Sequence, residues 1–131
     1  MIDIKLLEQL CLCNGISGDE VNVRNLIIKD CADDIKTDNL GNLIVFKKGK
    51  KSAKSKLMVS AHMDEVGLMV TDITSDGYLK FDEVGGIDRR VLPGKRVCVG
   101  RNGLNGVIGV KPIHLTNSDE KTAVPKMNDM Y

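Results

Sequence analysis

The sequence predicts an α/β lobe followed by a small all-β lobe, and three observations carry that prediction. Apolar residues recur at helical spacing up to about Ala32. A short run, Leu57–Ala61, is apolar on both faces, which is typical of a strand covered by helices. From Leu68 onward, short strand-like runs alternate with glycine-containing turns, as in small all-β lobes. We therefore place a lobe boundary between residues 66 and 67.

Two helices are predicted at the N-terminus. Apolar residues within Ile2–Leu12 follow helical spacing, and Asn14–Gly15 supplies a stop signal. Ser17–Glu20 then offers a capping residue followed by acidic groups, which favour a helix N-terminus. We expect the second helix to begin after this segment and to continue to about Ala32.

The apolar period changes after the second predicted helix. Ile35–Asp38 and Leu43–Phe46 flank a turn that contains Gly41, which predicts a β-hairpin. The lysine-rich segment 47–56 follows. A run of like charges repels itself and stays hydrated, so we interpret it as a solvated loop rather than a phosphate site.

The second lobe is predicted to contain four short strands. Ser75–Gly77 and Asn102–Gly103 are its clearest turns. The expected strands are Leu68–Ile73, Tyr78–Phe81, Arg96–Val99 and Val107–Val110.

Composition excludes several classes of partner. The chain has 131 residues and a net charge of +1, so it shows no broad attraction for nucleic acid or for an anionic membrane. Aromatic residues make up 3% and tryptophan is absent, which argues against stacking on single-stranded nucleic acid. The N-terminus does not resemble a signal peptide, and the four cysteines are expected to be buried, reduced thiols. These features predict a cytoplasmic protein.

The candidate site is the segment around His62 and Asp64. Alternation along a strand places these two side chains on the same face, at the carboxyl end of the apolar run. A histidine beside a carboxylate is a common metal-site arrangement, although the pair alone is also compatible with a structural histidine. Alternation turns Glu65 to the opposite face, so we expect a structural role for it. His114 is expected to serve packing or subunit contact, and Arg89, Arg90 and Arg96 to form surface ion pairs.

The string around His62 resembles the motif of the M42 metallo-aminopeptidases, the group of the glutamyl and tetrahedral aminopeptidases. Further segments follow in the order seen in that family, and the similarity extends over essentially the whole chain. The segments are His62–Gly67, Gly41–Leu43, Gly85–Asp88, Val91–Val97 and Gly106–Leu115.

This resemblance implies a fold and an activity. Residues 1–66 would form the N-terminal part of a zinc-exopeptidase catalytic lobe, and residues 67–131 a β-barrel-like inserted lobe used in assembly. The protein would act on peptides and would form a homo-oligomer through the β lobe. His62 would ligate one of two divalent metal ions, zinc or cobalt, and Asp64 would orient that histidine as a catalytic residue.

The same resemblance implies that this chain by itself is inactive. A zinc ion needs about four ligands and two bridged metals need more, whereas this sequence supplies one matched ligand, His62. We therefore expect weak or no metal binding by the chain alone. The alternative is a non-catalytic binding or assembly module that acts through the β lobe.

Overall fold

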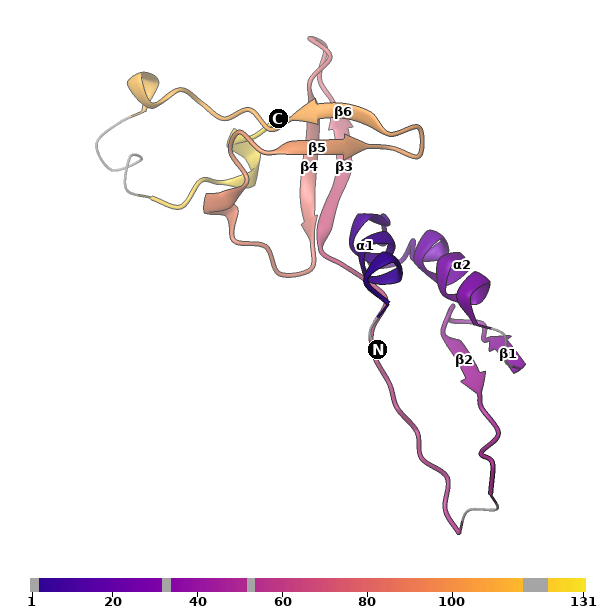
Figure 1. Cartoon of the computed structure of the whole chain (residues 1–131). Coiled ribbons are helices and arrows are strands. Elements are labelled where there is room, and N and C mark those ends of the chain that lie inside the picture. The colour runs from indigo at the N-terminus through magenta and orange to yellow at the C-terminus, as the bar shows by residue number, and fades with distance from the viewer. Residues whose placement is uncertain (1–2, 32–33, 52–53, 117–122) are drawn as a thin grey trace. The chain divides into compact units, whose positions relative to one another are not determined.

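A computed structural model describes residues 3–31, 34–51, 54–116 and 123–131. The fold mixes helices with short antiparallel strands (Figure 1). It separates into two compact units, Met1–Glu65 and Val66–Tyr131. Each described sheet lies within one unit: one in the first and two in the second.

The first unit contains the two predicted helices. Helix α1 spans Ile4–Leu12, and the Asp3 carboxylate caps it by accepting hydrogen bonds from the backbone N–H groups of the first turn at 2.9 and 3.2 Å. Helix α2 spans Val21–Asp30 and begins without a side-chain cap. Its Val23 is buried.

The predicted hairpin follows α2. Strands β1 (Asp34–Thr37) and β2 (Leu43–Phe46) pair antiparallel. The Asp38 carboxylate organises the turn, because it accepts hydrogen bonds from the backbone of Leu40 and from the backbone and side chain of Asn42, each at 2.9 Å. The hydrogen bond from the Asn42 side chain holds the pKa of Asp38 below its usual value. Gly41 has φ +88°, a conformation that other residues rarely adopt.

The prediction of a helix-covered strand at Leu57–Ala61 is wrong for this structure. The segment is extended but pairs with no described strand, as its trace in Figure 1 shows. Leu57, Met58 and Val59 are 91%, 88% and 84% exposed. The segment forms no strand, and no described strand or helix covers the side chains of Leu57, Met58 and Val59.

The second unit is built on two β-hairpins. Strands β3 (Gly67–Ile73) and β4 (Leu79–Val84) pair antiparallel with a bulge near Val70. Strands β5 (Arg96–Val99) and β6 (Leu104–Val107) form the second hairpin. The last strand therefore begins three residues before the predicted Val107, because the turn at Gly100–Gly103 is tight enough to pair Val99 directly with Leu104.

The described strands of this unit form two separate two-stranded sheets. Three single-turn 3-10 helices connect and follow them. These are η1 (Arg89–Val91), η2 (Ile113–Leu115) and η3 (Met127–Asp129).

The core of the second unit gathers residues from both hairpins and from the C-terminal segment. Leu92, Ile108, Met127 and Met130 are buried together. Partly buried residues of β3, β4 and β5 pack on them, including Leu68, Phe81 and Val97. The Lys80 ammonium fixes the C-terminal segment from the side, donating to the carbonyls of Asn128 at 2.8 Å and Met130 at 3.1 Å.

Two arginines form the surface ion pairs expected from the sequence. Arg89 contacts Glu83 through two hydrogen bonds of 2.6 and 3.0 Å, and Arg90 contacts Asp88 in the same bidentate way, with a shortest distance of 2.6 Å. The side-chain hydrogen bond from Arg90 lowers the pKa of Asp88 to about 2.

The expectation about the cysteines is wrong in one respect. None of the four forms a disulfide, but Cys11 and Cys98 are exposed and Cys13 and Cys31 are half-buried. Helix α1 buries no side chain in this structure, which leaves Cys11 on an open face. Among the described residues, no helix is both long and apolar enough to span a membrane.

Candidate functional site

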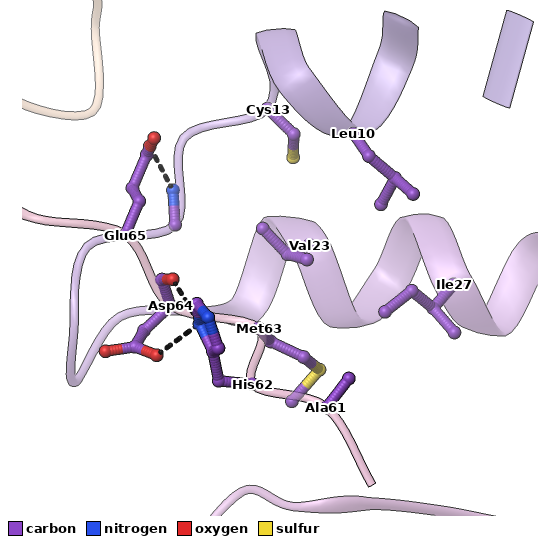
Figure 2. A pocket seen from close by; sticks show the side chains of 10 residues that line it. Leu10, Cys13, Val23, Ile27, Ala61, His62, Met63, Asp64 and Glu65 are labelled. Carbon is purple, nitrogen blue, oxygen red and sulfur yellow. Dashed lines mark hydrogen bonds and ion pairs between the residues drawn. The ribbon is translucent and has the colours of Figure 1, made fainter. Parts of the chain in front are cut away.

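His62 and Asp64 lie side by side at the end of the extended segment. The Nδ1 atom of His62 is 3.1 Å from Oδ1 of Asp64 and 3.0 Å from the Asp64 carbonyl oxygen (Figure 2). Both partners accept hydrogen bonds, so Nδ1 carries the proton and donates it. The Nε2 atom then keeps its lone pair for a ligand, which is the arrangement that metal-binding histidines share.

This pair sits at a small pocket of the first unit. The pocket encloses about 370 Å³. One wall consists of apolar side chains from the two helices, Leu10, Val23 and Ile27, and the other is the segment Ala61–Glu65 (Figure 2). The His62 side chain is 85% exposed and that of Asp64 41%, so the imidazole is open to ligands from solvent.

Glu65 faces a different neighbour. Its carboxylate accepts a hydrogen bond from the Gly15 N–H at 3.1 Å, while its own N–H donates to the Gly15 carbonyl at 2.7 Å. The Glu65 carbonyl also accepts from Ser17 at 3.3 Å. These contacts give Glu65 the structural role expected from strand alternation, because they join the segment that carries His62 to the loop after α1.

The sequence indicated only that Gly15 helps to end the first helix, and it gave no sign that Gly15 packs closely against distant residues. A Cβ atom on Gly15 would lie 2.5 Å from a methyl carbon of Val23 and 3.3 Å from the Met63 carbonyl oxygen. Only glycine allows the loop to approach α2 and the His62 segment this closely. A close approach of this kind leaves no pattern in a single sequence.

The ligand set of the described site is small. Within residues 3–31, 34–51, 54–116 and 123–131, no three His, Cys, Asp or Glu side chains lie together in a way that could hold a metal ion. His114 lies exposed in η2 of the other unit. The residues present fit one position of a metal site: an imidazole whose Nδ1 contacts a carboxylate, with Nε2 turned away from that contact.

A family model of the M42 glutamyl aminopeptidases matches residues 41–131, the stretch that contains the His62 motif and the whole second unit. The chain belongs to the M42 family. A relative from Acetivibrio thermocellus, provisionally named an aminopeptidase, is 48% identical over 107 residues, which cover 79% of this chain and 30% of the relative. The chain thus spans about a third of the length of the M42 relatives that it matches.

Solved structures of TET peptidases match the fold over nearly the whole chain. A TET aminopeptidase from the marine archaeon Thaumarchaeota archaeon SCGC AB-539-E09 has a TM-score of 0.84 at 32% identity, covering 97% of this chain and 36% of that protein. The Pyrococcus horikoshii TET1 peptidase, described as assembling into a tetrahedron or a large octahedral shell, has a TM-score of 0.78 at 40% identity, covering 97% and 38%.

One similar structure carries a different activity in its name. A Thermotoga maritima protein described as an endoglucanase is 44% identical, with a TM-score of 0.76, and the match covers 95% of this chain and 36% of that protein.

Proposed function

We propose that this chain supplies the N-terminal part of the catalytic lobe, and an assembly lobe, of a dinuclear metal aminopeptidase that releases N-terminal residues from peptides. The observation that carries the proposal is the His62–Asp64 pair, with Nδ1 donating to the carboxylate and Nε2 left open beside a pocket. Membership of the M42 family supports the peptidase chemistry.

His62 would hold one of two divalent ions, zinc or cobalt, through Nε2. Such an ion polarises a carbonyl oxygen and lowers the pKa of a bound water. Asp64 acts through the imidazole, because its carboxylate holds the Nδ1–H tautomer and keeps the ring in place. The Glu65 carboxylate accepts a hydrogen bond from the Gly15 N–H, which helps hold the segment that carries His62 beside the pocket.

The chain by itself would bind metal weakly and would not turn over peptides. A zinc ion takes about four ligands, and the described residues contain no group of three His, Cys, Asp or Glu side chains that could hold a metal ion. The remaining ligands and the general base would come from the two thirds of the M42 length that this chain does not match.

The second unit, Val66–Tyr131, would serve assembly. The support is the shell-forming TET1 peptidase, whose structure matches 97% of this chain. We infer a homo-oligomer built through this unit. None of the four cysteines forms a disulfide, which fits a reducing cytoplasm.

A chimeric enzyme tests the proposed activity. In it, this chain replaces the matching N-terminal third of the Acetivibrio thermocellus relative, and aminoacyl-p-nitroanilides are assayed with added zinc or cobalt. We expect turnover that His62→Asn abolishes and Asp64→Asn lowers about 10–100-fold, as loss of a partner behind a metal ligand does. His114→Asn is the matched control and should leave turnover unchanged.

Two results would contradict the proposal. One is hydrolysis of cello-oligosaccharides by the chimera without peptidase activity, which would favour the endoglucanase name of the Thermotoga maritima protein. The other is unchanged peptidase activity in the His62→Asn chimera. Turnover of peptides by this chain alone would contradict the narrower claim that it is inactive by itself.

A further inference from the structure

The lysine-rich segment 47–56 holds most of the positive charge of the first unit. It contains six lysines and no acidic residue, and the whole stretch from Asn39 to Met63 lacks aspartate and glutamate. The unit Met1–Glu65 has ten acidic residues, all outside this stretch, and only four basic residues outside the segment. The segment therefore carries a formal charge of +6, against −6 for the rest of its unit.

The net charge of the chain conceals this separation. A net charge of +1 predicts no broad attraction for an anionic surface. Such a surface responds mainly to charges that lie within about 10 Å of it, the Debye length in about 0.1 M salt. Positive charges gathered in one segment can therefore attract an anionic surface although acidic residues elsewhere balance them in the total.

The lysines of the segment are available for such a contact. The described residues of the segment, 47–51 and 54–56, form neither helix nor strand, and every lysine among them is exposed. In Figure 1 the chain runs from β2 away from α1 and α2 towards these lysines and returns through Leu57–Ala61. Within the described part of the chain, no ion pair involves Lys48, Lys50, Lys51, Lys54 or Lys56.

The composition of the segment favours a lipid surface over a nucleic acid. Nucleic-acid sites use aromatic side chains to stack on bases and arginine to hold a phosphate through two hydrogen bonds, and the segment has neither residue type. Lysine is a compact, strongly hydrated point charge, which suits a fluid surface whose negative charge is spread over many headgroups. Clusters of about four to eight basic residues are typical of segments that bind anionic lipids.

We propose that the segment binds the surface of a bilayer that contains anionic lipids, through Lys48, Lys50, Lys51, Lys54 and Lys56. The lysines stay hydrated at the headgroups, which agrees with the interpretation of the segment as solvated. Each lysine near an anionic bilayer raises the affinity roughly fivefold. The inference does not rest on the proposed function, because it uses no residue of the site at His62.

Sedimentation with lipid vesicles tests this contact. The vesicles contain phosphatidylcholine with about one third phosphatidylglycerol, in about 0.1 M salt. We expect the whole chain to sediment with them and to be released in about 1 M salt, where the Debye length falls to about 3 Å. Vesicles of phosphatidylcholine alone should bind the chain at least about tenfold more weakly.

A triple variant identifies the segment as the contact. Lys48→Gln, Lys50→Gln and Lys51→Gln together remove three of the five charges and should weaken vesicle binding roughly a hundredfold. Glutamine is polar, and these positions are exposed and lie outside helices and strands, so the fold should not change.

The matched control removes three charges elsewhere in the same unit. Lys5→Gln, Lys29→Gln and Lys36→Gln alter exposed lysines and give the same net charge as the first variant. We expect this control to bind vesicles within about threefold of the unchanged chain, because salt screens charges far from the contact.

Acetylation of lysines gives a second measurement that needs no variant. Anionic vesicles should slow the acetylation of Lys48, Lys50 and Lys51 at least about fivefold, as followed by mass spectrometry. Acetylation of the three control lysines should proceed at the rate seen without vesicles.

The outcomes decide the inference in either direction. Protection of the segment lysines, together with a loss of binding confined to the first variant, supports it. No sedimentation in about 0.1 M salt, equal sedimentation with phosphatidylcholine alone, or equal losses in the two variants would each overturn it. Tighter binding of polyuridylate RNA than of the anionic vesicles would also overturn it, because the segment would then be a nucleic-acid contact.

Discussion

The backbone of Gly109 exchanges two hydrogen bonds with Tyr131: the Gly109 N–H donates to the Tyr131 carbonyl at 2.7 Å, and the Tyr131 N–H donates to the Gly109 carbonyl at 3.2 Å. The neighbouring residues Val110 and Met130 form an isolated antiparallel bridge. The chain that leaves β6 therefore pairs with the C-terminal segment, and Met130 is placed in the core by that pairing.

Gly109→Ala should destabilise the second unit. A Cβ atom at this position would lie 2.5 Å from Cε2 and 2.9 Å from Cδ2 of the Tyr131 ring, so either the ring or the backbone must shift. We expect a loss of about 1–3 kcal/mol in the free energy of unfolding, the usual cost of overpacking, measured by urea denaturation. Gly86→Ala is the matched control, because a Cβ there meets nothing within 4 Å. Equal stability of the two variants would contradict the close contact.

Lys80→Met should loosen the C-terminal segment. The substitution keeps much of the apolar stem but removes the two hydrogen bonds to the Asn128 and Met130 carbonyls. A loss of about 1–2 kcal/mol is expected from charged donors at a partly exposed position. Amide exchange of Met127–Met130 should become faster while that of β1 and β2 stays unchanged. Lys95→Met, at an exposed lysine, should change neither.

The carboxyl group of Asp88 should titrate far below an ordinary aspartate. Its pKa is lowered from 3.8 to about 2, chiefly by the side-chain hydrogen bond from Arg90 and also by the Arg90 backbone N–H. A pKa that is lower in the folded state stabilises the fold above pH 3.8, and this contribution disappears as the pH falls from there to about 2.

Titration of the Asp88 carboxyl followed by NMR checks this value directly. Arg90→Ala removes the largest cause of the shift and should raise the midpoint towards 3.8. Arg89→Ala is the control, since Arg89 contacts Glu83 instead and its removal should raise the pKa of Glu83. An Asp88 midpoint that does not respond to Arg90→Ala would contradict the ion pair.

Glu65→Ala should weaken the loop after α1, whereas Glu65→Gln should not. Alanine leaves the N–H of the buried Gly15 without its side-chain acceptor, which costs about 1–2 kcal/mol, while glutamine keeps a carbonyl oxygen in place. Amide exchange at Gly15 and urea denaturation measure the difference. In the chimeric enzyme Glu65→Gln should retain most activity. A complete loss of activity in that variant would show that the charge of Glu65, rather than its hydrogen bond, is needed.

Local patterns in the sequence predicted the elements that depend on local signals. The hairpin of β1 and β2 was predicted almost to the residue, because its turn residues and its apolar runs agree. Strand β5 was predicted with its observed bounds. The pairing of β6 was placed too late, since both Leu104–Val107 and Val107–Val110 are apolar enough for a strand and only the turn geometry decides between them.

Features that depend on distant contacts could not be predicted from one sequence. His62 and Asp64 were correctly placed on one face, as strand alternation requires, but the bond from Glu65 to Gly15 joins residues 50 positions apart. The hydrogen bonds from Lys80 to the C-terminal segment join residues that are 48 and 50 positions apart in the sequence. For Leu57–Ala61 the apolar composition predicts burial, but Leu57, Met58 and Val59 are exposed. Burial depends on a neighbouring element, and the composition of one segment does not predict its neighbours.

The two tyrosines of the protein lie together, with the Tyr78 and Tyr131 rings 4.8 Å apart and tilted by 60°. The protein has no tryptophan, so its near-ultraviolet absorption and emission come almost wholly from this one pair. Tyrosine absorption and fluorescence therefore report on how Tyr131 packs against Tyr78. They do not report on changes around His62, because the first unit contains no tyrosine. A test of zinc binding by tyrosine fluorescence would need a fluorescent probe introduced into the first unit.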